Sequence, residues 1–281
     1  LYYIFKGKRQ GGQAGLRQIR CKVTAFGVKM AVRGRNNWPE KGKMATFASV
    51  LNTTDMKKTL LLACTLCLML ACGRQSSPEP MRGIILNTVD LSTVDDWPER
   101  AAANGINTIG THMFPGEVLS FIRSEKGKAF MENCRKHGIE VEHQLHAMGE
   151  LLPRNLFDAD SAMYRMDEHG HRVNDFNCCV HSLRALDTIA ANAVRVSQEL
   201  RPTNHRYYYW LDDGKPTCQC DKCRQYSISE QALIIENHII KALRRHDPEA
   251  MLAHLAYFNS LEAPRKVKPE EGVFLEFAPF L

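Results

Sequence analysis

The chain lacks several features that would assign it directly to a common class. No hydrophobic run reaches the roughly 18 residues that a membrane-spanning helix needs. No G-x-G-x-x-G follows the first apolar segment of the body, so a dinucleotide-binding fold has no support. That segment also lacks a closing H-x-H, and no isolated C-x-x-C stands near a thioredoxin-like helix. Metal-dependent catalysis and redox chemistry are therefore not favoured.

The body of the chain also lacks an excess of positive charge. The whole sequence carries a formal charge of +6. Residues 1–56 contain 11 Lys and Arg against two acidic residues, which leaves 26 basic and 29 acidic residues in the remainder. Because the basic excess is confined to these first residues, we expect no nucleic-acid partner for the folded part.

Residues 56–71 predict a bacterial lipoprotein signal peptide. Met56 and two lysines precede a short apolar stretch that ends in Leu-Met-Leu-Ala-Cys. This resembles a lipobox, in which Cys72 becomes the lipidated first residue, and an ordinary cleaved secretory signal is the alternative. Residues 72–80 then form a flexible tether. We expect residues 1–55 to be non-native upstream sequence or a disordered basic arm. The protein would be exported and held by its lipid in the periplasm or at the surface of a Gram-negative cell.

Residues 81–281 alternate short apolar runs with helical segments. Strands are expected at 83–88, 106–113, 139–148, 206–211, 251–258 and 272–280, and helices at 95–105, 116–137, 183–200 and 227–245. Strands that recur after helices imply parallel βαβ units. Polar residues gather where the strands end, which is typical of a (β/α)8 barrel. The predicted fold is an α/β, TIM-barrel-like domain truncated after about six strands, and an open, flavodoxin-like parallel sheet is the alternative.

Three carboxylates are candidates for catalysis. Asp212 and Asp213 end the fourth expected strand, and because side chains alternate, only one of them should face the barrel mouth. Glu276 lies in an otherwise apolar strand, where an ionised side chain is costly unless it faces a polar cavity. An aspartate and Glu276 would supply the two carboxylates that glycoside hydrolysis uses. An Asp-Asp-Gly turn and a buried ion pair are the structural alternatives.

Aromatic and polar side chains near the strand ends are candidates for contacts to a sugar. They are His112, His143, His146, Asn177, Trp210 and Tyr257. His143 and His146 are three residues apart, so in a strand they face opposite sides and would not chelate one ion together.

The segment CQCDKC brings Cys218, Cys220 and Cys223 into six positions. Three soft ligands on a tight loop suit zinc, but a structural zinc takes four. Cys178 or Cys179, from the long loop at about 150–181, could supply the fourth. Since export permits disulfides, a disulfide to one of these two is equally natural. We expect a structural role, as a zinc site or a disulfide, and no cofactor required for catalysis.

Several motifs resemble one family. VEHQLHAM, MDEHGHRVNDFNCCVHS, RYYYWLDDG, CQCDKCR, SEQALIIEN and LAHLAYFN are similar to domain of unknown function family 4838, over about residues 81–281. Its members are multi-domain exported proteins of Bacteroidetes and related bacteria. The resemblance implies a carbohydrate-active barrel near the family 20 hexosaminidases and the α-glucuronidases.

The resemblance also implies roles for the two aspartates. Asp212 and Asp213 stand where family 20 enzymes have an adjacent Asp-Glu pair, whose glutamate is the general acid and whose aspartate orients the acetamido group. Asp213 is one methylene shorter, which argues against substrate-assisted cleavage of N-acetylhexosamines.

The sequence therefore predicts a glycoside hydrolase-like lipoprotein that acts on glycans. Asp212 or Asp213 would be the general acid, and Glu276 the second carboxylate. The alternatives are a non-catalytic glycan-binding surface lipoprotein and a zinc-dependent barrel hydrolase.

Overall fold

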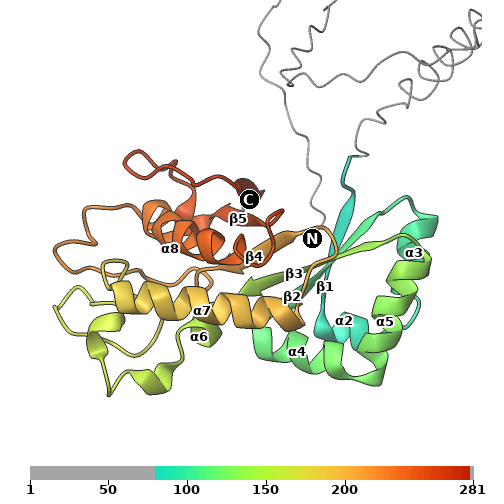
Figure 1. The fold of residues 1–281 in the computed structure, drawn as a ribbon, viewed down its shortest axis with the longest axis horizontal. Helices are drawn as coiled ribbons and strands as arrows, with labels where there is room; N and C mark the ends of the chain where they lie inside the picture. The colour runs from blue at the N-terminus through green and yellow to red at the C-terminus, as the bar shows by residue number, and fades with distance from the viewer. Residues whose placement is uncertain (1–79, 279–281) are drawn as a thin grey trace, which may run out of the picture. The chain divides into compact units, whose positions relative to one another are not determined.

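Six parallel strands form the centre of the computed structural model, which describes residues 80–278 (Figure 1). Each strand is hydrogen-bonded in parallel to the next one in chain order. The strands are β1 (Gly83–Asn87), β2 (Thr108–Met113), β3 (Glu140–His146), β4 (Arg206–Trp210), β5 (Met251–Tyr257) and β6 (Val273–Ala278). All six predicted strands, and the α/β class, are therefore confirmed.

The strand order distinguishes between the two predicted architectures. A doubly wound, flavodoxin-like sheet reverses its strand order at a switch point. The order β1-β2-β3-β4-β5-β6 contains no reversal, so the flavodoxin-like topology is wrong for this chain. The six strands form instead a curled, open half-barrel. Closure into an eight-stranded barrel stays a prediction.

Seven α-helices and three short 3-10 helices occur in residues 80–278. They are α2 (Thr88–Thr93), α3 (Trp97–Ala103), α4 (Pro115–Arg123), α5 (Glu125–Lys136), α6 (Met148–Leu151), α7 (Leu183–Glu199), α8 (Ile228–Leu243), η1 (Arg154–Leu156), η2 (Ser161–Met163) and η3 (Phe258–Ser260). As the sequence predicted, α8 begins with a capping box, in which Ser227 and Glu230 satisfy each other's backbone N–H groups.

The helix predicted over 116–137 is wrong as a single element. Ser124 adopts an extended conformation between α4 and α5, and its hydroxyl accepts a hydrogen bond from the Gly127 N–H. Serine competes for backbone hydrogen bonds in this way, which favours helix starts over helix interiors. The chain therefore turns at Ser124 and starts a second helix.

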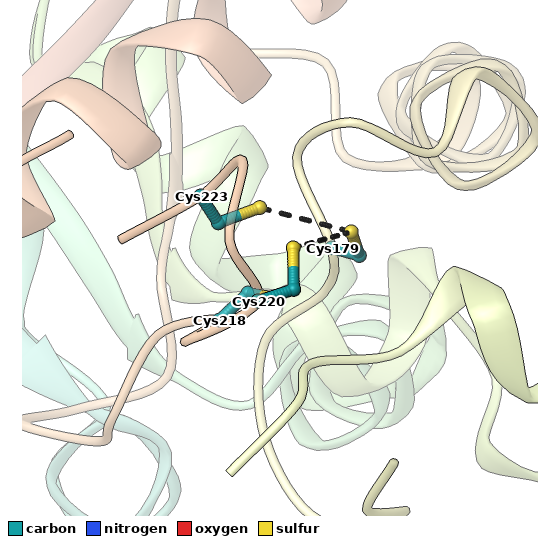
Figure 2. Close-up of side chains that lie close together, drawn as sticks. All are labelled: Cys179, Cys218, Cys220 and Cys223. Carbon is teal, nitrogen blue, oxygen red and sulfur yellow. Dashed lines mark hydrogen bonds between the residues drawn. The ribbon is translucent and has the colours of Figure 1, made fainter. Parts of the chain in front are cut away.

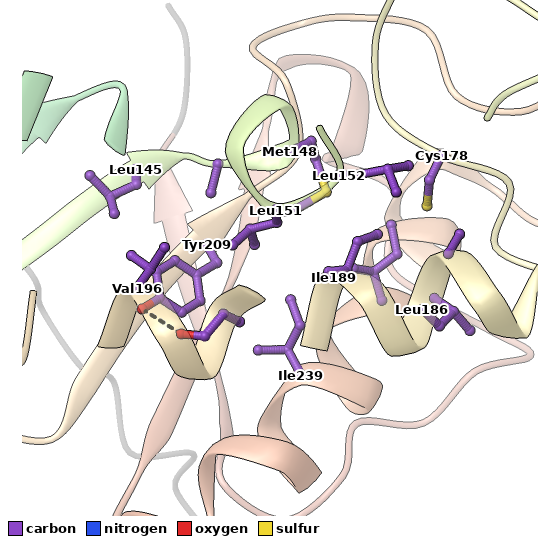
Figure 3. Close-up of a cluster of buried hydrophobic side chains, with 14 of the residues drawn as sticks. Leu145, Met148, Leu151, Leu152, Cys178, Leu186, Ile189, Val196, Tyr209 and Ile239 are labelled. Carbon is purple, nitrogen blue, oxygen red and sulfur yellow. Dashed lines mark hydrogen bonds between the residues drawn. The ribbon is translucent and has the colours of Figure 1, made fainter. Parts of the chain in front are cut away.

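Strand alternation directs one face of the sheet towards the helices. Leu145 of β3 and Tyr209 of β4 pack on α7 and α8 in the larger apolar cluster (Figure 3). Ile109 of β2 packs in a second cluster, which includes Phe130 of α5. In Figure 1, α3, α4 and α5 accordingly lie beside β1 to β3, and α7 and α8 beside β4 and β5. The opposite face of the sheet is left to carry polar residues.

The predictions for the amino-terminal part fall outside the described residues. They concern the upstream segment 1–55, the signal peptide 56–71, the lipidated Cys72 and the tether 72–80. Among the helices that the structure does describe, none has the length and apolarity to cross a membrane.

Two helical glycines predict opposite effects of the same substitution. A Cβ at Gly127 would lie 2.0 Å from the Phe121 carbonyl oxygen, whereas a Cβ at Gly116 would meet nothing within 4 Å. We expect Gly127→Ala to lower the free energy of unfolding by about 2 kcal/mol or more, because backbone has to move. The control Gly116→Ala should leave it unchanged or raise it by up to about 1 kcal/mol. Urea unfolding measures both, and equal stabilities would contradict the close approach at Gly127.

Candidate functional site

A cavity of about 430 Å³ lies at the carboxyl ends of the strands, on the face away from the helices. Twelve residues line it: Ile85, Asn87, Asp90, His112, Gln144, His146, Trp210, Asp213, Leu255, Tyr257, Glu276 and Ala278. Six of the predicted site residues are among them: one from each of β2 to β6, and Asp213 from the loop after β4. His143, Asn177 and Asp212 are not.

The two adjacent aspartates separate. Asp213 is exposed and lines the cavity. The Asp212 carboxylate accepts hydrogen bonds from the Asn177 backbone N–H at 2.8 Å and from the Arg154 guanidinium at 3.2 Å. Of the two aspartates, only Asp213 lines this cavity. If the strand had continued, alternation would have pointed Asp212 to the same face as Trp210. However, β4 ends at Trp210 and the chain bends beyond it.

Asn177 belongs to the same loop contact and not to the cavity. Its side-chain oxygen accepts from the Asp212 N–H at 3.0 Å, and its side-chain nitrogen donates to the Pro216 carbonyl at 2.8 Å. The backbone is left-handed, with φ of 48°, and the residue is 1% exposed. Asparagine tolerates this conformation better than most residues. Asn177 and Asp212 together therefore tie the β3–α7 loop to the β4–α8 loop.

Glu276 is a buried carboxyl group that lines the cavity from β6. Its Oε2 accepts a hydrogen bond from the Trp210 indole N–H at 3.1 Å. Burial and, to a lesser degree, the nearby Glu142 carboxylate raise the pKa of Glu276 to about 8. The group is therefore mostly protonated at neutral pH and carries a proton that it can donate.

Glu142 is a member of this arrangement that the sequence analysis missed. It is 1% exposed, and it accepts hydrogen bonds from the Tyr208 hydroxyl at 2.7 Å and the Asn204 amide at 2.6 Å. The Arg206 guanidinium lies 3.6 Å from it. The sequence could have indicated Glu142 by its position, because it alternates with Gln144 and His146 on the polar face of β3.

Trp210 is packed into the floor of the cavity. Its ring centroid lies 5.2 Å from that of His146 and 5.9 Å from that of His112, and the residue is 6% exposed. Little of the ring face is left for a sugar, which was its predicted role. Its indole N–H instead orients the Glu276 carboxyl group. Tyr257, which is half-buried, is the aromatic side chain with more exposed surface in the cavity.

Two histidines present hydrogen-bond acceptors to the cavity. The Nδ1–H of His112 donates to the Gln144 carbonyl at 3.0 Å, and that of His146 donates to the Leu211 carbonyl at 2.8 Å. Each bond makes Nδ1 the donor, so in the neutral form of the ring Nε2 is the acceptor. Burial lowers the pKa of His112, which keeps its ring neutral. Gln144 also lines the cavity, but its side-chain Oε1 is buried and has no hydrogen-bond partner in residues 80–278.

His143 lies away from the cavity, on the helix-facing side of β3. Its Nδ1 is 2.8 Å from the Thr111 hydroxyl, and burial lowers its pKa to about 4. The prediction that His143 and His146 face opposite sides of the strand is confirmed.

Ser229, His254 and Glu236 form a buried chain of hydrogen bonds that the sequence analysis also missed. The Ser229 hydroxyl is 3.0 Å from His254 Nε2, and His254 Nδ1 is 2.6 Å from Glu236. This order resembles a nucleophilic triad. All three residues are 6% exposed or less, so a substrate does not reach the serine. The chain of hydrogen bonds fastens α8 to β5.

Four of the predicted cysteine ligands converge at a second place (Figure 2). The Sγ atoms of Cys179, Cys218, Cys220 and Cys223 all lie within 4.8 Å of one another. Cys178 turns into the apolar core instead (Figure 3), where burial raises its pKa. The choice left open between Cys178 and Cys179 is thus decided for Cys179. Within residues 80–278, this is the one group of three or more Cys, His, Asp and Glu side chains close enough to hold an ion.

Comparison with protein families identifies the family of the chain. A family model described as "Domain of unknown function (DUF4838)" matches residues 107–280, which is more than half of the chain. No curated protein matches the chain. The matched region includes every cavity residue except Ile85, Asn87 and Asp90.

The raised pKa of Glu276 predicts a pH-dependent effect of Glu276→Gln on stability. The pKa of the buried carboxyl group is about 8, whereas its ordinary value is 4.5. The stabilisation from its neutral form is therefore complete below pH 4.5 and is lost as the pH rises to about 8. Glutamine stays neutral and keeps the bond to Trp210. We expect the variant to gain stability over the wild type across this range, reaching on the order of a few kcal/mol.

Urea unfolding at several pH values measures this difference. Glu168→Gln, at an exposed glutamate, is the control and should show no such trend. A difference between Glu276→Gln and the wild type that does not change with pH would contradict the assignment.

Proposed function

The chain belongs to the DUF4838 family, and we propose that it hydrolyses glycosidic bonds of glycans in the cavity at the strand ends. One observation carries the proposal: two carboxyl groups in unlike surroundings, Glu276 and Asp213, line the same cavity. Glycosidases use such a pair, in which one group donates a proton to the leaving oxygen and the other acts as base or nucleophile.

Glu276 is the general acid in this proposal. Its proton is retained at neutral pH because the group is buried and faces the Glu142 carboxylate. The indole N–H of Trp210 holds one oxygen, which orients the other. Asp213, on the solvent side, is the second carboxylate. The sequence analysis expected an aspartate as the general acid and Glu276 as the second carboxylate, and this assignment exchanges the two roles. Asp212 then serves to position the loop.

The remaining polar groups suit a carbohydrate. Sugar hydroxyls donate hydrogen bonds, and the Nε2 atoms of His112 and His146, which line the cavity, can accept them. Tyr257 supplies an aromatic surface at the same cavity. Sites of this kind combine apolar walls with a few placed polar groups.

We further propose that the half-barrel is part of a (β/α)8 barrel. Sequential parallel strands with a site at their carboxyl ends are typical of that fold. Leu275 and Phe277, on the helix-facing side of β6, are 63% and 53% exposed. Apolar exposure on the side that helices cover elsewhere supports the packing of a further βα unit there.

Export with a lipid on Cys72 remains a proposal that rests on the signal-like pattern of residues 56–71. We expect the chain to incorporate labelled fatty acid when it is expressed in a Gram-negative host, and Cys72→Ser to abolish the label. Cys67→Ser, within the apolar stretch, is the control and should keep it. Secretion of an unlabelled wild-type protein would support the ordinary signal peptide instead.

Turnover of aryl glycosides and of plant and mucin glycans tests the catalytic roles. Glu276→Gln should lower kcat about 10²- to 10⁴-fold on substrates with poor leaving groups. The loss should be smaller for activated aryl glycosides, because their leaving groups need little protonation. Asp213→Asn should lower kcat for both kinds of substrate. The fall of the wild-type rate above pH 8 should disappear in Glu276→Gln.

Asp158→Asn, at an exposed aspartate of the long loop, is the matched control and should retain the wild-type rate. Equal rates in the wild type, Glu276→Gln and Asp213→Asn would overturn the carboxylate assignment. Glycan binding without turnover in the wild type would favour the non-catalytic alternative. Loss of turnover in a chelator, with the fold intact, would favour the zinc-dependent alternative.

A further inference from the structure

The four sulfur atoms lie within 4.8 Å of one another, and two of their separations are those expected around one metal ion. Cys179 Sγ lies 3.7 Å from Cys223 Sγ and 4.0 Å from Cys220 Sγ. A disulfide would place two sulfurs at about 2.05 Å. Four zinc–sulfur bonds of about 2.3 Å in a tetrahedron place the sulfurs about 3.8 Å apart. The separations of Cys179 Sγ from the sulfurs of Cys220 and Cys223 are close to this edge.

We propose that Cys179, Cys218, Cys220 and Cys223 bind one Zn²⁺ ion as a closed structural site. Thiolates are soft ligands that favour zinc, and four of them fill its tetrahedral coordination. No position is left for water or substrate, so the ion has a structural and not a catalytic role. Binding releases the four thiol protons to solvent and changes no oxidation state.

The surroundings of the sulfurs suit this ion. Four thiolates around one Zn²⁺ leave a net charge of −2, and the Arg172 Nη1 lies 3.8 Å from Cys218 Sγ. The Met166 backbone N–H donates to the same sulfur at 3.3 Å. Such groups outside the ligand set stabilise and orient the ligands. Cys179 and Cys220 also border an open cavity of about 420 Å³, which gives the ion a path of entry.

The ion would join the two loops that position the Asp213 carboxylate in the cavity at the strand ends. Cys179 lies in the β3–α7 loop, and the other three cysteines lie in the β4–α8 loop. The same two loops meet at the bonds from Asp212 to Arg154 and Asn177. Asp213 follows directly in the chain. The link from the metal to Asp213 rests on the proposed function, whereas the metal site itself does not.

Metal analysis of the purified chain tests the site. We expect one zinc per chain after purification without chelator, and an absorption spectrum of tetrahedral thiolate coordination after replacement by Co²⁺. Cys179→Ala should hold less than one-tenth of the wild-type zinc. Cys178→Ala is the control at the neighbouring buried cysteine, and it should keep one zinc per chain.

If Cys179→Ala does not fold, the wild-type stoichiometry and the cobalt spectrum decide alone. A wild-type chain whose intact mass lacks four hydrogens and which binds no zinc would contain two disulfides, and the proposal would be wrong. Four reactive thiols with no zinc bound would overturn it equally. Zinc without glycoside turnover would support the metal site while the proposed function fails.

Discussion

Parallel pairing in chain order is the constraint on which the site depends. Because every strand runs in the same direction, all six carboxyl ends meet at one edge of the sheet. The register keeps these ends level: Asn87 pairs with His112, His146 with Trp210, and Tyr257 with Ala278. Because side chains alternate along each strand, every second side chain then points to the face of the sheet away from the helices. Polar side chains separated by more than 160 residues thereby line one cavity.

Glu276 is the buried carboxyl group of the cavity, and burial together with the nearby Glu142 carboxylate raises its pKa. Glu142 is surrounded by donors, namely the Tyr208 hydroxyl, the Asn204 amide and the Arg206 guanidinium, so its charge is compensated. Glu276 has one neutral donor, the Trp210 indole, and it faces that charge. The proton therefore resides on Glu276. Because the pKa of Glu276 is raised, this arrangement lowers the stability of the fold at neutral pH.

Many features of the fold and of the site could be predicted from local patterns. Periodicity predicted the six strands, the opposite orientation of His143 and His146, and the different orientations of Asp212 and Asp213. Capping chemistry predicted the capping box at Ser227. Other features could not, because they depend on where a strand ends or on what lies across the molecule. The end of β4 at Trp210 placed Asp213 in the cavity, and burial together with the nearby Glu142 carboxylate raised the pKa of Glu276.

The sequence by itself determined the α/β class, the strand and helix segments, and the kinds of side chain at the strand ends. Periods of 2 and 3.6 residues and the cap residues encode these properties within about ten neighbours. The tertiary structure decided the strand order, the membership of the cavity and the choice of Cys179 over Cys178. These depend on contacts between residues far apart in the chain, such as Cys179 and Cys223, and no local pattern specifies such contacts.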